Sequence, residues 1–181
     1  MMGVVSGTPP PLPAAPAELK AFLRITVSDE DALIAGLLRA AADLCEAFTG
    51  RALVDRAVQE MAAASIAPIR LGMVPVREIE SVAAIDGSGA ATILEANTYT
   101  VEIDPLGDGR VMLRGAMAAK RLRITYRAGM AADWNGVPEM LRHGIIRLAA
   151  HYYLRRGDAQ DAELPAAVTA LWRPWRQLKL K

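Results

Sequence analysis

Only a few residues of this sequence have the types and the spacing that catalysis or metal binding requires. The two histidines, His143 and His151, stand eight residues apart. Two ligands on one helix face need a spacing of about four residues to share a metal ion. No serine lies in a Gly-x-Ser-x-Gly nucleophile motif. We therefore expect both histidines to be structural or surface residues, and we predict no catalytic residue and no metal site.

The turn segments rich in glycine and aspartate also lack the features of a ligand site. Gly107-Asp108-Gly109 does not open a helix, as a phosphate-binding loop must. Residues 104–110 lack the closing glutamate of a calcium-binding loop. Glu78 and Glu80 lie two residues apart on a predicted strand, which places both carboxylates on one face. Their proximity therefore does not indicate a catalytic pair. The sequence predicts a non-enzymatic protein that binds no cofactor.

The residues best suited to bind a partner protein lie near the carboxyl end. Trp and Arg are the side chains most enriched where binding energy concentrates in protein interfaces. Each occurs twice in the segment 172–176, Trp-Arg-Pro-Trp-Arg. Pro174 should bend or end the helix that carries them, and a basic tail follows. The predicted partner-binding residues are Trp172, Arg173, Trp175, Arg176 and Lys179.

The alternative for the two tryptophans is that both pack as hydrophobic core. Trp175 fits that alternative well, because it continues an apolar stripe formed by Val168 and Leu171. Trp172 lies off this stripe. The pattern therefore favours Trp172 as the side chain that contacts a partner.

Four amphipathic segments predict helices that would position these residues. In the strongest of them Ser28 is the expected amino-terminal cap, acidic residues fill the first turn, and Thr49-Gly50 ends the helix. Pro138 and Pro165 stand where two further helices should begin. The predicted helices cover about residues 18–24, 29–48, 138–156 and 165–175.

Short β-rich runs, separated by turn residues, fill the sequence between residues 54 and 127. Residues 99–103 and 121–126 alternate apolar and polar side chains, so each run should have one buried and one solvated face. We predict an α+β fold that is mostly helical. It would be a helical bundle with a small antiparallel β insert at about residues 54–127.

The composition is that of a soluble globular protein, with 52% hydrophobic and 23% charged residues in a chain of 181. The sequence has no run of 18 apolar residues, so we predict no membrane span, and it shows no signal-peptide pattern. The single cysteine, Cys45, excludes an internal disulfide. We expect a protein made in the cytoplasm. Its predicted parts are a flexible Pro-rich arm at residues 1–16, one domain at 17–176 and a basic tail at 177–181.

Acidic and basic residues are divided unequally along the sequence. Residues 1–107 carry 7 Lys and Arg against 14 Asp and Glu, whereas residues 108–181 carry 14 against 6. Six basic residues and no acid lie between Arg110 and Arg127. Such a distribution can attract nucleic acid or let identical subunits meet through opposite charges. It is equally compatible with a mixed, solvated surface on which the two halves interleave.

An ordered set of short segments resembles a known family. It runs from the arm to the tail: Leu-Lys-Ala-Phe-Leu-Arg-Ile at 19–25, Ser-Asp-Glu-Asp-Ala-Leu-Ile at 28–34, Glu-Ala-Phe-Thr-Gly-Arg at 46–51, Ile-Thr-Tyr-Arg-Ala-Gly at 124–129, Val-Pro at 137–138, Leu-Pro at 164–165 and Leu-x-x-Pro-x-Arg at 171–176. In order and spacing, this set resembles the head–tail connector (adaptor) proteins of tailed bacteriophages and of phage-like gene transfer agents.

The resemblance implies a structural role in a virion or phage-like particle, at the portal vertex. Members of the family assemble as a homo-oligomeric ring, typically of twelve copies, beneath the portal protein. Double-stranded DNA passes through the lumen without sequence-specific binding, and a tail-side stopper or terminator protein docks on the far face. The portal-engaging part of this chain would be residues 165–181. The resemblance fits a phage and a gene transfer agent equally well.

Two other functions stay open at this point. The basic run from Arg110 to Arg127 is compatible with a DNA-binding or DNA-packaging accessory protein. A tail-completion or stopper protein of the same particle would differ from a connector only in its neighbour in the assembly.

Overall fold

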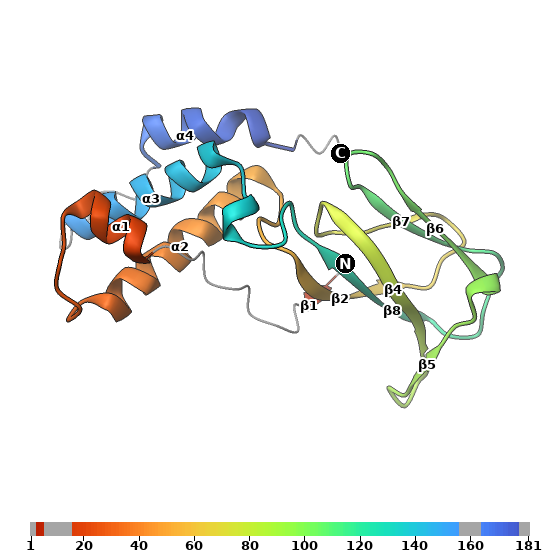
Figure 1. Ribbon diagram of the computed structural model, residues 1–181. Coiled ribbons are helices and arrows are strands. Elements are labelled where there is room, and N and C mark those ends of the chain that lie inside the picture. The colour runs from red at the N-terminus through yellow and green to blue at the C-terminus, as the bar shows by residue number, and fades with distance from the viewer. Residues whose placement is uncertain (1–2, 6–15, 156–163, 178–181) are drawn as a thin grey trace. The chain divides into compact units, whose positions relative to one another are not determined.

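The computed structural model describes residues 3–5, 16–155 and 164–177 (Figure 1). The chain divides into two compact units, and each is described by itself. The β unit contains Val54–Met130 together with Gly3–Val5. The α unit is built from the chain on both sides of Val54–Met130, from residues 16–53, 131–155 and 164–177.

The α unit consists of helices from two distant parts of the sequence. The elements are α1 (Pro16–Leu23), α2 (Asp31–Thr49), the 3-10 turn η2 (Trp134–Gly136), α3 (Glu139–Leu154), α4 (Ala166–Trp172) and the 3-10 turn η3 (Arg173–Trp175). Helices α2 and α3 pack against each other, α4 packs on α3, and α1 contacts both α2 and α3.

The apolar spacing of α2 explains how it packs. Ile34, Leu38, Ala41 and Cys45 recur at intervals of four, three and four residues, and all four are buried. Gly50 ends the helix in the left-handed conformation, with φ of 70°, and its N–H donates to the carbonyl of Glu46. The expected side-chain cap from Ser28 is absent among the described residues, because the helix begins three residues later, at Asp31.

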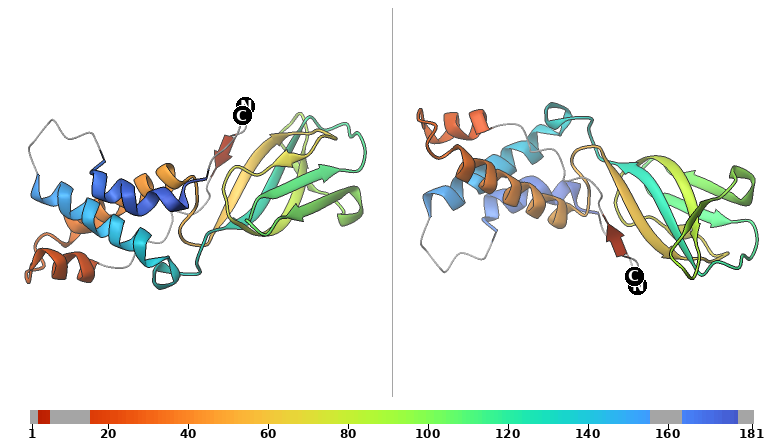
Figure 2. Two further views of the ribbon diagram at one scale, coloured as in Figure 1. Left: turned by 90° about the horizontal axis from the view of Figure 1, so that it is seen from above. Right: turned by 90° about the horizontal axis from the view of Figure 1, so that it is seen from below.

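The β unit contains two antiparallel sheets (Figure 2). The five-stranded sheet has the order β1-β2-β8-β4-β5, and the three-stranded sheet has the order β3-β7-β6. The strands are β1 (Gly3–Val5), β2 (Arg56–Ala63), β3 (Ile69–Arg70), β4 (Val76–Ile85), β5 (Ala91–Ile93), β6 (Tyr99–Ile103), β7 (Gly109–Leu113) and β8 (Arg121–Ala128), with the 3-10 turn η1 (Ala96–Thr98) before β6.

One hydrophobic core joins the two sheets. Strand β8 lies at the centre of the larger sheet, and its alternate residues Leu122, Ile124 and Tyr126 are fully buried. Val111 and Leu113 of the smaller sheet belong to the same buried cluster. The inner faces of the sheets therefore bury each other, and the β unit has a core of its own.

The prediction of a mostly helical bundle with a small β insert is therefore wrong. The segment 54–127 forms two sheets with a separate core, not a minor addition to the helices. The predicted helical ranges 18–24, 29–48, 138–156 and 165–175 lie near α1 to α4, but these helices make up only one of the two units. Periodicity shows which face of a strand is buried, whereas the extent of a sheet depends on pairing between distant strands.

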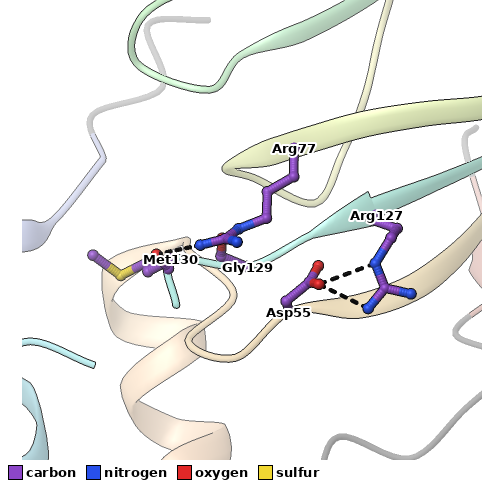
Figure 3. Close-up of polar contacts among 5 residues, drawn as sticks. All are labelled: Asp55, Arg77, Arg127, Gly129 and Met130. Carbon is purple, nitrogen blue, oxygen red and sulfur yellow. Dashed lines mark hydrogen bonds and ion pairs between the residues drawn. The ribbon is translucent and has the colours of Figure 1, made fainter. Parts of the chain in front are cut away.

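Polar side chains form hydrogen bonds between the two segments through which the chain enters and leaves the β unit (Figure 3). The Arg77 guanidinium donates to the carbonyl oxygens of Gly129 and Met130 at 2.9 and 3.0 Å. Nε and Nη2 of Arg127 both donate to Oδ2 of Asp55, at 3.0 and 2.7 Å. The hydrogen bond and the charge of Asp55 raise the pKa of Arg127. The two ends of the segment are thus joined by charge-assisted hydrogen bonds.

Candidate docking surface at the carboxyl end

Trp172, at the end of α4, lies in the core of the α unit. Its side chain is fully buried, and its indole N–H points at the carbonyl of Leu141 at 3.4 Å. The ring packs 5.9 Å from the ring of Phe48, between centroids. A Cβ at Gly144 of α3 would collide with the indole, so Trp172 occupies space that only a glycine leaves open.

The structure thus reverses the expected burial of the two tryptophans: Trp172 is the buried one and Trp175 the more exposed one. Helix α4 ends at Trp172, and the chain continues as the tighter turn η3. The buried pair is Val168 and Trp172, four residues apart, whereas Trp175 is half-buried. The predicted apolar stripe of Val168, Leu171 and Trp175 assumed α-helical spacing, but Trp175 lies on the 3-10 turn η3 and not on α4.

Three of the other predicted partner-binding residues, Arg173, Trp175 and Arg176, lie at the surface of the α unit. Arg173 and Arg176 are exposed, and Trp175 is half-buried between them. Lys179 lies outside the described residues. We call Arg173, Pro174, Trp175 and Arg176 the C-terminal surface.

Residues at the end of the C-terminal surface contact the last turn of α2. The Arg176 guanidinium lies 5.6 Å from the centre of the Phe48 ring, a cation–π contact. The backbone N–H of Gln177 donates to the carbonyl of Thr49 at 2.8 Å, in the last turn of α2. Cationic groups near the carboxyl end of a helix are also favoured by its dipole. Within the described residues no acidic side chain forms an ion pair with Arg173 or Arg176.

The two histidines are not brought together. His143 is exposed on α3, and His151 is half-buried with its ring beside that of Tyr152. Across the described ranges, no three His, Cys, Asp or Glu side chains come close enough to hold a metal ion. In the turn that resembles part of a calcium loop, the Asp104 carboxylate accepts from the backbone N–H groups of Leu106 and Asp108, at 2.9 Å each. Asp104 therefore stabilises the turn itself.

A buried carboxylate in the β unit was not singled out from the sequence. Glu60 is fully buried, and its Oε2 accepts from the Tyr126 hydroxyl and from the Gly72 N–H, both at 2.9 Å. Burial raises the pKa of the Tyr126 hydroxyl, which therefore stays protonated and able to donate. Period-two alternation with Val58 could have placed Glu60 on the inner face. These contacts join β2, β8 and the loop after β3, which is a structural role.

The six basic residues between Arg110 and Arg127 lie on β7, on β8 and in the loop between these strands, and β7 and β8 belong to different sheets. Arg110 pairs with Glu102 at 3.8 Å, and Arg127 pairs with Asp55 at 2.7 Å. Such ion pairs cancel positive charge on Arg110 and Arg127 that nucleic acid would otherwise attract.

Comparison with known proteins agrees with the resemblance seen in the sequence. Residues 17–79 match the model of a family described as phage gp6-like head-tail connector protein. No curated protein matched the chain. Within the described residues no helix has the length and apolar character needed to cross a membrane.

Solved structures match the chain over almost its whole length. A chain from the neck of an empty GTA particle, computed with C6 symmetry, has 28% sequence identity and a TM-score of 0.83, covering 99% of this chain and 97% of that one. A chain from the virion of a native gene transfer agent (GTA) particle has 29% identity and a TM-score of 0.80, over 98% and 97%. A third, from the neck of a native GTA particle computed with C12 symmetry, has 28% identity and a TM-score of 0.79, over 99% and 97%. These matches confirm the resemblance to head–tail connectors.

Proposed function

We propose that this chain is a structural, non-enzymatic head–tail connector subunit in the neck of a phage or gene-transfer-agent particle. The observation that carries the proposal is the likeness to a GTA neck chain over 99% of this chain, with a TM-score of 0.83. Because both units are matched, residues 17–176 would act as one connector subunit. The match to a connector family over residues 17–79 supports the same role.

In this proposal the subunits form a ring. The neck structures that contain similar chains were computed with C6 and C12 symmetry, which supports a closed ring of twelve copies. Closed rings require two different patches on each subunit. The portal protein would lie on one side of the ring and a stopper or terminator protein on the tail side. Double-stranded DNA would pass through the lumen without sequence-specific contacts.

The C-terminal surface is the part that we propose engages the portal. Arg173 and Arg176 are exposed there without acidic partners in the described chain, and Trp175 is half-buried beside them. A half-buried tryptophan between arginines is a residue combination typical of binding hot spots. Trp172 would hold this surface in place from within the core and would not touch the partner itself.

The test is a binding measurement between the full chain and the portal protein of the same particle. Replacing Arg173, Trp175 and Arg176 together by alanine should weaken binding by about 2 kcal/mol or more, roughly thirtyfold in Kd. The matched control replaces Arg121, an exposed arginine of the β unit, and should leave Kd unchanged. Portal binding at full strength by a chain truncated after Glu163 would refute the docking proposal.

The same preparation separates the connector from a DNA-binding accessory protein. Electrostatic DNA binding weakens steeply as salt is added. Two of the six basic residues of the run, Arg110 and Arg127, are paired with acids, so we expect weaker retention on double-stranded DNA than six unpaired charges would give. Strong, salt-sensitive retention that Arg121→Ala reduces would favour the DNA-binding function instead.

A further inference from the structure

Helix α2 carries a second apolar face besides the one that is buried. Leu33, Leu37, Ala40 and Leu44 recur at intervals of four, three and four residues, so they share one side of the helix. This set, the α2 stripe, is offset by one residue from the buried set that begins at Ile34. Leu33 and Leu44 are 38% and 37% exposed, and Ala40 is also exposed. Within the described chain the α2 stripe is therefore incompletely covered.

Helix α3 presents a narrow exposed face of a different character. Met140, His143, Arg147 and Leu154 recur at intervals of three, four and seven residues, which again places them on one side. We call them the α3 face. Met140 and Leu154 are 46% and 72% exposed, and the other two are exposed as well. Of the twelve other positions of α3, seven are buried, and Glu139 in the first turn is also exposed. The α3 face is therefore part of the side of the helix that is left for another molecule.

The two faces are complementary in charge as well as apolar. Asp43 adjoins the α2 stripe, next to Leu44, and Arg147 lies within the α3 face. Both are exposed, and neither forms an ion pair with another described side chain. Opposite charges beside apolar patches favour one partner and one register.

We infer that the α2 stripe of one subunit packs on the α3 face of the next subunit, with Asp43 opposite Arg147. The inference rests on the proposed ring. A second copy of this chain is the fitting occupant because the two faces match each other and lie on different helices of the same unit. A contact between two different patches is heterologous and repeats around a ring, whereas one self-matching patch would stop at a dimer.

Cysteine cross-linking tests this interface on rings assembled on the portal protein. One full-length chain carries Ala40→Cys and another His143→Cys, both with Cys45→Ala to remove the native thiol. Mixed rings should give covalent dimers on mild oxidation, and neither chain should do so alone. A chain with both cysteines should give a ladder of multimers. The control pair, Ala40→Cys with Ala116→Cys in the β unit, should give no dimer.

Charge reversal tests the same contact without cysteines. Asp43→Arg or Arg147→Asp alone should reduce ring assembly at least tenfold, and the two changes together should restore it. Glu95→Arg, an exposed reversal in the β unit, should have no effect. Rings that form without cross-links and tolerate Asp43→Arg would overturn the interface but leave the connector function standing. No assembly of the unaltered chain on the portal would overturn both.

Discussion

The packing of Trp172 against Gly144 predicts that Gly144→Ala, which adds a single methyl group, lowers the free energy of unfolding of the α unit. Gly144 lies within α3, where alanine is normally the better helix former by about 1 kcal/mol. A Cβ at this position would collide with the indole nitrogen and lie 2.9 Å from two ring carbons of Trp172. The indole cannot simply move away, because it is fully buried and packed beside Phe48.

The expected size of the effect follows from these opposing contributions. Forcing an extra methyl group into a well-packed core costs about 1–3 kcal/mol, occasionally more. Since the clash here is with a rigid ring, we expect the upper part of that range, and a net loss of about 1–2 kcal/mol after the gain in helix propensity. Gly36→Ala in α2 is the matched control. Nothing lies within 4 Å of a Cβ there, so the free energy of unfolding should rise by up to about 1 kcal/mol.

Urea unfolding followed by tryptophan fluorescence is the assay. All three tryptophans, Trp134, Trp172 and Trp175, belong to the α unit, so the signal reports that unit even if the β unit unfolds separately. The transition midpoint should fall for Gly144→Ala and rise for Gly36→Ala. If both variants gain stability equally, Trp172 does not fill the space beside Gly144, and the account of a fixed C-terminal surface is refuted.

Three further predictions concern buried groups and close backbone contacts. Burial raises the pKa of the Cys45 thiol above its value in the unfolded chain. The thiol therefore contributes fully to the free energy of unfolding below pH 8. Above pH 9 this contribution falls by about 1.4 kcal/mol for each pH unit, because the unfolded chain loses the thiol proton and the folded chain keeps it. Fluorescence-monitored unfolding should show this slope, and Cys45→Ala should remove it. Glu60→Leu leaves the Tyr126 hydroxyl and the Gly72 N–H without their acceptor and should cost about 1–3 kcal/mol for each, whereas Glu60→Gln keeps an acceptor and should cost less. Faster hydrogen exchange of β2 and β8 amides is the readout, and equal exchange in both variants would contradict this role. Gly129→Ala should accelerate the same exchange, because its Cβ would collide with the backbone of Asp55, while Gly87→Ala, with nothing within 4 Å, should not.

The sequence locates the helices better than it describes the β unit. Local spacing alone identifies α2 as an amphipathic helix, and its apolar side includes the buried residues Ile34, Leu38 and Ala41. The β unit depends on pairs such as Val58 with Tyr126 and Ile79 with Tyr126, which join strands that are distant in the sequence. No local pattern names those partners. That is why the extent of the two sheets and their separate core could not be predicted.

The candidate site shows a second limit of local patterns. Arginine is rarely buried without a partner, so the exposure of Arg173 and Arg176 can be expected without knowledge of the fold. The burial of the two tryptophans could not be predicted in this way. It depends on where α4 becomes the turn η3, and on Gly144, which leaves space for the indole of Trp172. Position 144 is distant in sequence from Trp172, so a helical wheel of α4 cannot include it.

Burial of Trp172 lowers the entropic cost of the portal docking that we propose for this end of the chain. A docking segment that is ordered only on binding must offset the entropy of fixing each side chain, about 0.5–1.5 kcal/mol per residue. Here Trp172 fixes the end of α4 from inside the core, and Arg176 and Gln177 are held by Phe48 and Thr49 of α2. Arg173 and Trp175 lie between these fixed points. A partner would therefore meet a surface that is already in place, and more of the contact energy would remain as affinity.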